Sequence, residues 1–286
     1  MSTERAEQLC QEADVLRNQG QTEEALRLYR EAADLFETAG EKIKAVDVGY
    51  LLVSTCLHME GKREEAVKMG QEAARRFAEL GAHDLEGSAY VNIGTANLND
   101  DQLKKAEEWF KKALETLQAL DSVIGQANFG IAHAKLGHTY AKEGRFDEAK
   151  HEFDEALEIL RRVGHWFFEH TTLMHLAQMF FAQKDYQNAL TYAQASLGLV
   201  YAENAIDEHA RRVAELKGII ARCYWELGNE DWGIRFFQEA ADLLNAMPDD
   251  VVHVVARNIR AAEFLDQVTA RRPGDRTKLD LKALAR

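Results

Sequence analysis

The stretch "KLGHTYAKEGRFDEAKHEFDEALEIL", residues 135–160, decides the fold. Apolar residues recur at helical spacing on both sides of Gly144, which predicts two helices separated by a turn. Gly137, Ala149 and Ala156 stand at positions where larger side chains would bury more surface. Helix axes pack about 8–10 Å apart, depending on the side chains at the contact. The small residues therefore predict two helices in close contact.

The same arrangement recurs along the chain. Gly144 has counterparts at Gly20, Gly61 and Gly228, and two further copies have Asp101 and Lys184 at this position, with spacings of 41, 40, 43, 40 and 44 residues. Such a period predicts an array of helix–turn–helix units. We predict six units, at residues 3–40, 41–81, 82–121, 122–164, 165–204 and 205–247.

Three positions in each unit are occupied only by Ala, Gly or Ser. The first lies late in the first helix, the second early in the second helix, and the third seven residues further on. They are Ala13, Ser54, Gly94, Gly137, Ala177 and Ala221; Ala25, Ala66, Ala106, Ala149, Ala189 and Gly233; and Ala32, Ala73, Ala113, Ala156, Ser196 and Ala240. Large residues beside these positions are expected to fill the core, each contributing roughly 1.5–3 kcal/mol on burial.

Composition agrees with an all-α chain. The only two prolines among 286 residues are Pro248 and Pro273, so a long stretch has no helix breaker. Cys10, Cys56 and Cys223 are isolated, which predicts no disulfide framework and a reducing compartment. The N-terminus lacks an apolar signal segment, and no window is apolar enough to span a membrane. We therefore predict a cytoplasmic protein.

Charge is unevenly distributed. The net charge is −13, although residues 271–286 carry six basic groups against two acidic ones. A strongly acidic body repels phosphate backbones, which argues against nucleic acid as a partner. Residues 249–270 have an apolar stripe at helical spacing, and Asp249 or Asp250 can cap the helix start. We predict one capping helix at 249–270 and a basic, disordered tail at 271–286.

The repeat resembles the tetratricopeptide repeat family. The best copy reads His133-Ala-Lys-Leu-Gly-His-Thr-Tyr140, then Gly144-Arg-Phe-Asp-Glu-Ala149. The period of 40–44 residues is longer than the family's usual 34, and the proline that usually closes each repeat is missing. The chain is thus similar to the long-repeat branch found in kinesin light chains, cell-polarity adaptors and bacterial peptide-sensing regulators. The resemblance implies a right-handed superhelical solenoid of six helix pairs plus the capping helix.

The resemblance also implies that the first helices line a concave groove that holds a partner. The phrase Ala89-Tyr-Val-Asn-Ile-Gly94 is close to the family's A-Y-x-N-L-G motif, whose asparagine can clamp a peptide backbone. Phe181 and Trp225 are expected to be neighbours beside Arg222, either as a binding hot spot or as packing between repeats. The predicted partner-binding residues are Leu51, Thr55, His58, Val91, Asn92, Thr95, His138, Met174, Gln178, Phe181, Arg222 and Trp225.

No catalytic or metal-binding motif accompanies the repeats. The chain has no G-x-S-x-G, phosphate-binding loop or H-E-x-x-H. His165, His170 and His175 are five residues apart, so they point in different directions from a helix. We predict no cofactor and no enzyme activity, but an adaptor that binds a peptide or helix of another protein. The alternatives are a peptide-sensing regulator that changes conformation on binding ligand and a homo-oligomeric scaffold.

Overall fold

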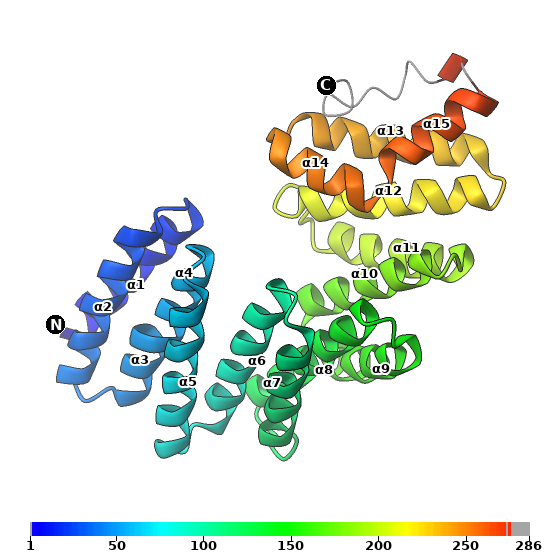
Figure 1. Cartoon of the computed structure of the whole chain (residues 1–286). Helices are drawn as coiled ribbons and strands as arrows, with labels where there is room; N and C mark the ends of the chain where they lie inside the picture. The colour runs from blue at the N-terminus through cyan, green and yellow to red at the C-terminus, as the bar shows by residue number, and fades with distance from the viewer. Residues whose placement is uncertain (1, 273, 276–286) are drawn as a thin grey trace. The chain divides into compact units, whose positions relative to one another are not determined.

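The computed structural model describes residues 2–272 and 274–275, and all their regular elements are helical (Figure 1). The all-α class predicted from the sequence is therefore confirmed. The chain divides into two compact units, Met1–Gly164 and His165–Arg286, which we describe separately.

Unit 1 contains four successive helix pairs. The first helix of the second pair is continuous but changes its hydrogen-bonding pattern twice. The elements are α1 (Ser2–Asn18), α2 (Thr22–Thr38), α3 (Lys42–Val46), the π-helix η1 (Asp47–Leu52), α4 (Val53–Met59), α5 (Arg63–Glu79), α6 (His83–Asn99), α7 (Leu103–Leu117), α8 (Val123–Lys142) and α9 (Phe146–Val163).

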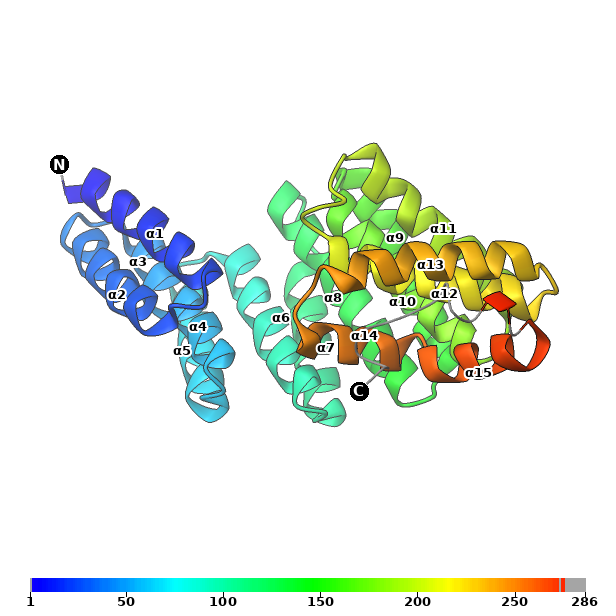
Figure 2. The same ribbon diagram turned by 90° about the horizontal axis from the view of Figure 1, so that it is seen from above.

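Unit 2 contains two helix pairs followed by two shorter helices. They are α10 (Trp166–Ala182), α11 (Tyr186–Ala202), α12 (Ala210–Glu226), α13 (Glu230–Asn245), α14 (Asp249–Asn258) and α15 (Ala261–Arg271). Both views show α14 and α15 beside the α12–α13 pair (Figures 1 and 2).

The turn within each pair has a left-handed residue at the position predicted from the sequence. Gly144 has φ of 77°, and the amide of Arg145 donates to the carbonyl of Tyr140 at 2.9 Å, which closes the end of α8. Asp101 and Lys184 adopt the same conformation, with φ of 58° and 63°. Only glycine adopts this region without steric cost. The turn geometry is therefore retained at two positions where the residue disfavours it.

The small residues lie where two helices of a pair touch. An added Cβ on Gly137 would lie 2.9 Å from the Phe153 ring and 3.1 Å from the carbonyl oxygen of Ala149. In the second pair, the Ser54 hydroxyl instead donates to the carbonyl of Ala66 at 2.7 Å. Phe153 is fully buried in the contact. The close packing predicted from Gly137 and Ala149 is thus present.

The prediction of a single capping helix at 249–270 is wrong, because the segment forms two helices, α14 and α15. The break lies at Ile259 and Arg260, where Arg260 is left-handed with φ of 50°. Arg222 of α12 donates to the Arg260 carbonyl at 3.0 Å and to Glu263 of α15 at 2.9 Å. One buried guanidinium thus binds both the N-cap residue of α15 and an acidic residue in the first turn of that helix. The N-cap of α14 is Pro248, not an aspartate.

Gly218 permits α14 to approach α12 closely. An added Cβ at this position would lie 2.6 Å from both Cδ1 and Cγ2 of Ile259. The corresponding positions of the other repeats hold larger residues: Cys10, Leu51, Val91, Ala134 and Met174. The glycine is therefore explained by the contact with the segment that follows the last repeat.

The predicted disordered tail at 271–286 lies mostly outside the described residues. Its first residue ends α15, and two of its arginines contact the start of α13. Arg271 lies 3.3 Å from Glu230, and Arg272 lies 2.5 Å from Asp231.

Candidate partner-binding surface

Five of the predicted partner-binding residues are half-buried on the first helices of unit 1. They are Thr55 and His58 of α4, Asn92 and Thr95 of α6, and His138 of α8, and we call them the first-helix face. Leu51 and Val91, predicted with them, are buried at 5% exposure each, so they support the surface from beneath.

Both threonines of the first-helix face bond to their own helices. The Thr55 hydroxyl donates to the Leu51 carbonyl at 3.1 Å, and the Thr95 hydroxyl donates to the Val91 carbonyl at 2.8 Å. These bonds satisfy the hydroxyl protons. The two threonines are therefore neutral and have no free hydrogen-bond donor on this face.

Asn92 differs from its neighbours because none of the described residues hydrogen-bonds its side-chain amide. The amide can donate twice and accept through its oxygen. By contrast, Asn99 at the end of α6 lies 3.2 Å from the Nε2 of His58. Asn92 thus provides an unengaged amide on the first-helix face, where Nδ1 of His58 is a second polar atom without a hydrogen-bond partner among the described residues.

His138 is the titratable group of this face nearest the α8–α9 turn. Burial lowers its pKa to about 3, and the nearby Lys135 and Lys142 lower it further. The imidazole is therefore neutral near pH 7.

The predicted hot spot in unit 2 is not accessible. Trp225 and Arg222 are each 1% exposed, and Phe181 is 6% exposed. The Trp225 ring packs against Phe264 of α15 with ring centroids 5.2 Å apart, while Arg222 is bound to the α14–α15 break. Of the two readings, packing is the one observed, because the last two helices cover this face of α12.

The other two unit 2 residues also make internal contacts. Met174 is buried in the core, and Gln178 donates to Glu215 at 2.7 Å. Asn258 of α14 donates to the same carboxylate at 3.2 Å. Burial raises the pKa of Glu215, since the two amide donors only partly offset its desolvation. We therefore leave the unit 2 residues out of the candidate surface.

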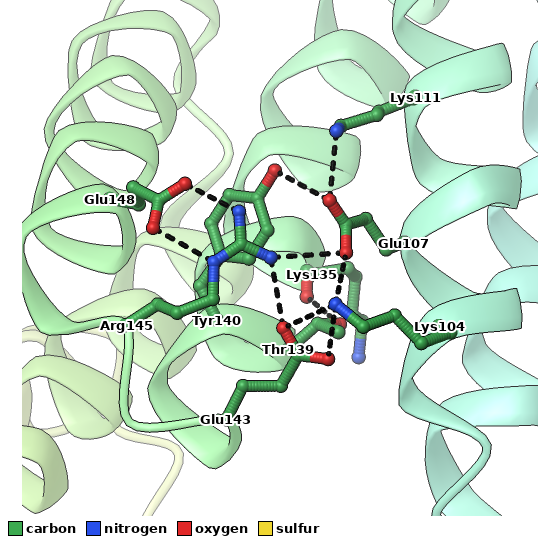
Figure 3. Close-up of polar contacts among 9 residues, drawn as sticks. All are labelled: Lys104, Glu107, Lys111, Lys135, Thr139, Tyr140, Glu143, Arg145 and Glu148. Atoms are coloured by element: carbon green, nitrogen blue, oxygen red, sulfur yellow. Dashed lines mark hydrogen bonds and ion pairs between the residues drawn. The ribbon is translucent and has the colours of Figure 1, made fainter.

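A polar network links α7 to the α8–α9 turn (Figure 3). Arg145 stacks over the Tyr140 ring at 3.8 Å and contacts Glu107 at 3.1 Å, Glu143 at 2.9 Å and Glu148. Burial alone would raise the pKa of Glu107, but Lys111, Arg145 and Lys104 outweigh it and hold the value at about 2. These carboxylates are saturated with donors, so the network joins two repeats and offers no free base.

The sequence did not lead us to a second concave region within unit 1. Two cavities of about 520 and 480 Å³ lie between the second helices α5 and α7 and share Gln71 and Trp109. The available signal was Trp109 itself, a large half-buried aromatic residue on a second helix.

No group of three or more His, Cys, Asp or Glu within residues 2–272 and 274–275 is arranged to hold a metal ion. Over the same residues, no helix has the length and apolar character needed to cross a membrane.

A family model described as tetratricopeptide repeat matches residues 47–119 and 129–202, and a second model of the same description matches residues 13–39. No curated protein matches the sequence.

Three solved structures illustrate the likeness in fold. A signal transduction ATPase with a tetratricopeptide repeat sensor from Pyrococcus horikoshii superposes with a TM-score of 0.71 at 17% identity, over 97% of this chain and 41% of that one. A Rap protein complexed with competence and sporulation factor gives 0.59 at 16% identity, over 90% and 66%. The apo quorum sensor NprR from B. thuringiensis gives 0.59 at 11% identity, over 86% and 78%. The chain thus spans about two fifths of the Pyrococcus protein.

Proposed function

The chain belongs to the tetratricopeptide repeat family, and from this premise we propose that it is a non-catalytic adaptor that binds a peptide or helix of a partner protein on the first-helix face of unit 1. Tetratricopeptide repeats imply protein–protein interaction in general terms. The more specific assignment to this face is our inference from the side chains that line it.

The observation that supports the proposal is the unengaged amide of Asn92. A polar group that becomes buried on binding must find a partner, since leaving it unsatisfied costs about 1–3 kcal/mol. A peptide backbone supplies both a donor and an acceptor for such an amide. The neighbouring threonines are already satisfied, so Asn92 is positioned to fix the ligand while Thr55 and Thr95 contact it without a polar cost.

The test is an affinity capture with the full chain, compared with two variants of the face. Asn92→Ala removes the amide, and Thr95→Arg places a long charged side chain on the same surface. Gln118→Ala is the control, because Gln118 is an exposed amide at the end of α7 in the same unit. A partner bound on this face should be recovered about 5–30-fold less with Asn92→Ala, as expected for the loss of about 1–2 kcal/mol.

The outcome that contradicts the proposal is also specific. If every captured protein is retained by Asn92→Ala and by Thr95→Arg, while circular dichroism shows both variants folded, the first-helix face is not the binding surface.

The second candidate function is a peptide-sensing regulator. The organisation into two compact units, which meet in sequence at Gly164 and His165, is the observation that favours it. A sensor of this kind changes its radius of gyration in solution scattering when a captured peptide is added, whereas a static adaptor does not. Light scattering on the same samples distinguishes both from a homo-oligomeric scaffold, whose mass depends on concentration.

A further inference from the structure

The two cavities between α5 and α7 form one candidate docking surface, which we call the Trp109 groove. One cavity lies between Arg63, Lys68 and Lys105, and Asn97 of α6 and the C-cap residue of that helix, Asp100, also line it. The other is lined by Arg75, Tyr90 and Lys112. Trp109 and Gln71 line both cavities, so the two form a continuous surface within unit 1.

Aromatic rings occupy the junction of the two cavities. The rings of Trp109 and Tyr90 stack with centroids 5.7 Å apart. The Nζ of Lys112 lies 4.4 Å from the Tyr90 centroid and 5.3 Å from the Trp109 centroid. A half-buried tryptophan beside a cation combines apolar contact area with charge, a combination found at interaction hot spots.

The lysines of α7 divide between two environments. Its two Lys-Lys pairs are 104–105 and 111–112. Lys104 and Lys111 both bind Glu107, at 3.4 and 2.8 Å, and Figure 3 shows both side chains directed to that carboxylate. Lys105 and Lys112 line the Trp109 groove instead. One lysine of each pair thus joins the repeats, and the other is left for the groove.

The groove lysines have no carboxylate partner among the described residues. Lys68 of α5 shares this property with Lys105 and Lys112, and outside the groove only Lys42 and Lys184 do so within the described part of the chain. In a chain of net charge −13, most other lysines are ion-paired. The unpaired lysines are therefore concentrated at this groove.

The acidic residues of the groove do not cancel this charge evenly. Asp100 is bound to Arg63 at 2.6 Å, and Glu79 is bound to Arg75. Glu64 and Glu108 line only the cavity that contains Lys68 and Lys105. The cavity at Tyr90, Trp109 and Lys112 has Glu79 as its one acidic lining residue, against the cations Arg75 and Lys112. Arg75 binds both Glu79 and Glu72, Arg76 also binds Glu72 at 2.8 Å, and the Tyr90 hydroxyl donates to Glu86 at 3.0 Å. The lining of this end is therefore aromatic and has an excess of one cation, Lys112.

We propose that the Trp109 groove is a second docking surface, which binds an acidic segment of a partner protein. An apolar side chain of the segment packs on Trp109, and its carboxylates pair with Lys112, Lys105 and Lys68. The surface is formed mainly by the second helices α5 and α7, with Tyr90 and Asn97 contributed by the first helix α6. It shares no residue with the first-helix face, so the proposal does not depend on the function proposed above.

The test uses a fluorescein-labelled twelve-residue peptide with six glutamates and a central leucine–phenylalanine pair, titrated with the full chain at low salt. The main variant is Lys68→Gln with Lys105→Gln and Lys112→Gln. The matched control is Lys42→Gln with Lys184→Gln, which removes unpaired lysines outside the groove. We expect the main variant to weaken binding about 10-fold, equivalent to 1.4 kcal/mol, and the control to change it less than about 2-fold.

Two further measurements separate the parts of the proposal. Trp109→Ala should also weaken binding about 10-fold, whereas Asn92→Ala on the first-helix face should leave it unchanged. Raising the salt concentration should weaken binding to the wild-type chain, because exposed charges are screened. If the triple variant does not fold, Lys112→Gln is tested alone, with Lys42→Gln as its control. Lys112→Gln should then weaken peptide binding by less than about 10-fold, and Lys42→Gln should leave the binding unchanged.

Several results would overturn the proposal. The first is that the groove variant and the control variant weaken peptide binding equally, and the second is that Trp109→Ala does not weaken it. The third is that the acidic peptide does not bind the wild-type chain, and the fourth is that a peptide with lysine in place of glutamate binds equally well. A concentration-dependent mass that Trp109→Ala abolishes would instead identify a second copy of the chain as the occupant, and would equally contradict an acidic partner segment.

Discussion

Gly218→Ala tests how closely the last helices pack on unit 2. The substitution adds one methyl group to α12 at the contact with Ile259. Gly198→Ala is a matched control, because Gly198 lies in helix α11 of the same unit and an added Cβ there has no atom within 4 Å. Both variants gain the same methyl group within a helix, so they differ only in the atoms that surround the added methyl group.

The expected magnitudes follow from two opposing effects. Alanine stabilises a helix by about 1 kcal/mol relative to glycine, and both variants receive this gain. At Gly218 the methyl would lie 2.6 Å from two atoms of Ile259 and 2.8 Å from its Cβ, whereas carbon atoms pack at about 3.5–4.0 Å. Because Ile259 is fully buried, we expect an overpacking cost near 3 kcal/mol, at the upper end of the usual 1–3 kcal/mol.

Gly218→Ala should therefore lose about 2 kcal/mol of unfolding free energy, while Gly198→Ala should gain about 1 kcal/mol. At roughly 2–4 °C per kcal/mol, the two melting temperatures should differ by about 6–12 °C in far-UV circular dichroism. Equal melting temperatures, or a more stable Gly218→Ala, would refute the close contact between α12 and the start of the α14–α15 break.

Three further predictions concern stability. Lys184→Gly should stabilise the chain by about 1 kcal/mol in urea titrations, because it relieves a left-handed lysine, whereas Lys184→Ala should have little effect. Burial lowers the pKa of His170 to about 4 from 6.5, so within this window the unfolded chain binds a proton that the folded chain does not. The His170 contribution to the unfolding free energy should thus fall by about 1.4 kcal/mol per pH unit as pH drops from 6.5 to 4, and His170→Gln should reduce the measured slope by that amount, leaving the contribution of His138. Arg222→Met should cost about 1–2 kcal/mol, since it removes the hydrogen bonds of a buried guanidinium to the Arg260 carbonyl and to the half-exposed Glu263, while the Phe264 amide still donates to that carbonyl; the exposed Arg235→Met should cost less than about 1 kcal/mol.

The repeat architecture could be predicted because it depends on residues that lie close together in the sequence. Gly144, Gly137 and Ala149 each act within one helix pair, at fixed short separations in the sequence. The turn residues were identified even where glycine is absent, at Asp101 and Lys184, because the spacing of the other copies placed them. Periodicity therefore gave the helix pairs and their close contacts.

The features that were not predicted depend on residues far apart in the sequence. The break at Arg260 is bound by Arg222, 38 residues earlier, and no helical pattern in 249–270 indicates such a partner. Trp225 is covered by Phe264 in the same way. The π-helix η1 is a similar case, since it interrupts a segment whose apolar pattern is continuous.

The candidate surfaces were predicted unevenly for a related reason. Asn92 could be identified from its motif, and its free amide keeps it in the proposal. The spacing of three and four residues within α7 does assign Lys104 and Lys111 to Glu107. The Trp109 groove could not be predicted, because the sequence does not show that Trp109, Lys105 and Lys112 lie beside residues of α5 such as Gln71.

The helices that follow the sixth hairpin also limit how the array can grow. Phe264 stacks on Phe237 with centroids 4.5 Å apart, and Trp225 lies beneath it. These side chains cover the surface on which a seventh hairpin would pack. A duplicated hairpin would therefore be tolerated between existing hairpins. A hairpin inserted after residue 247 would have to displace α14 and α15 from the α12–α13 pair.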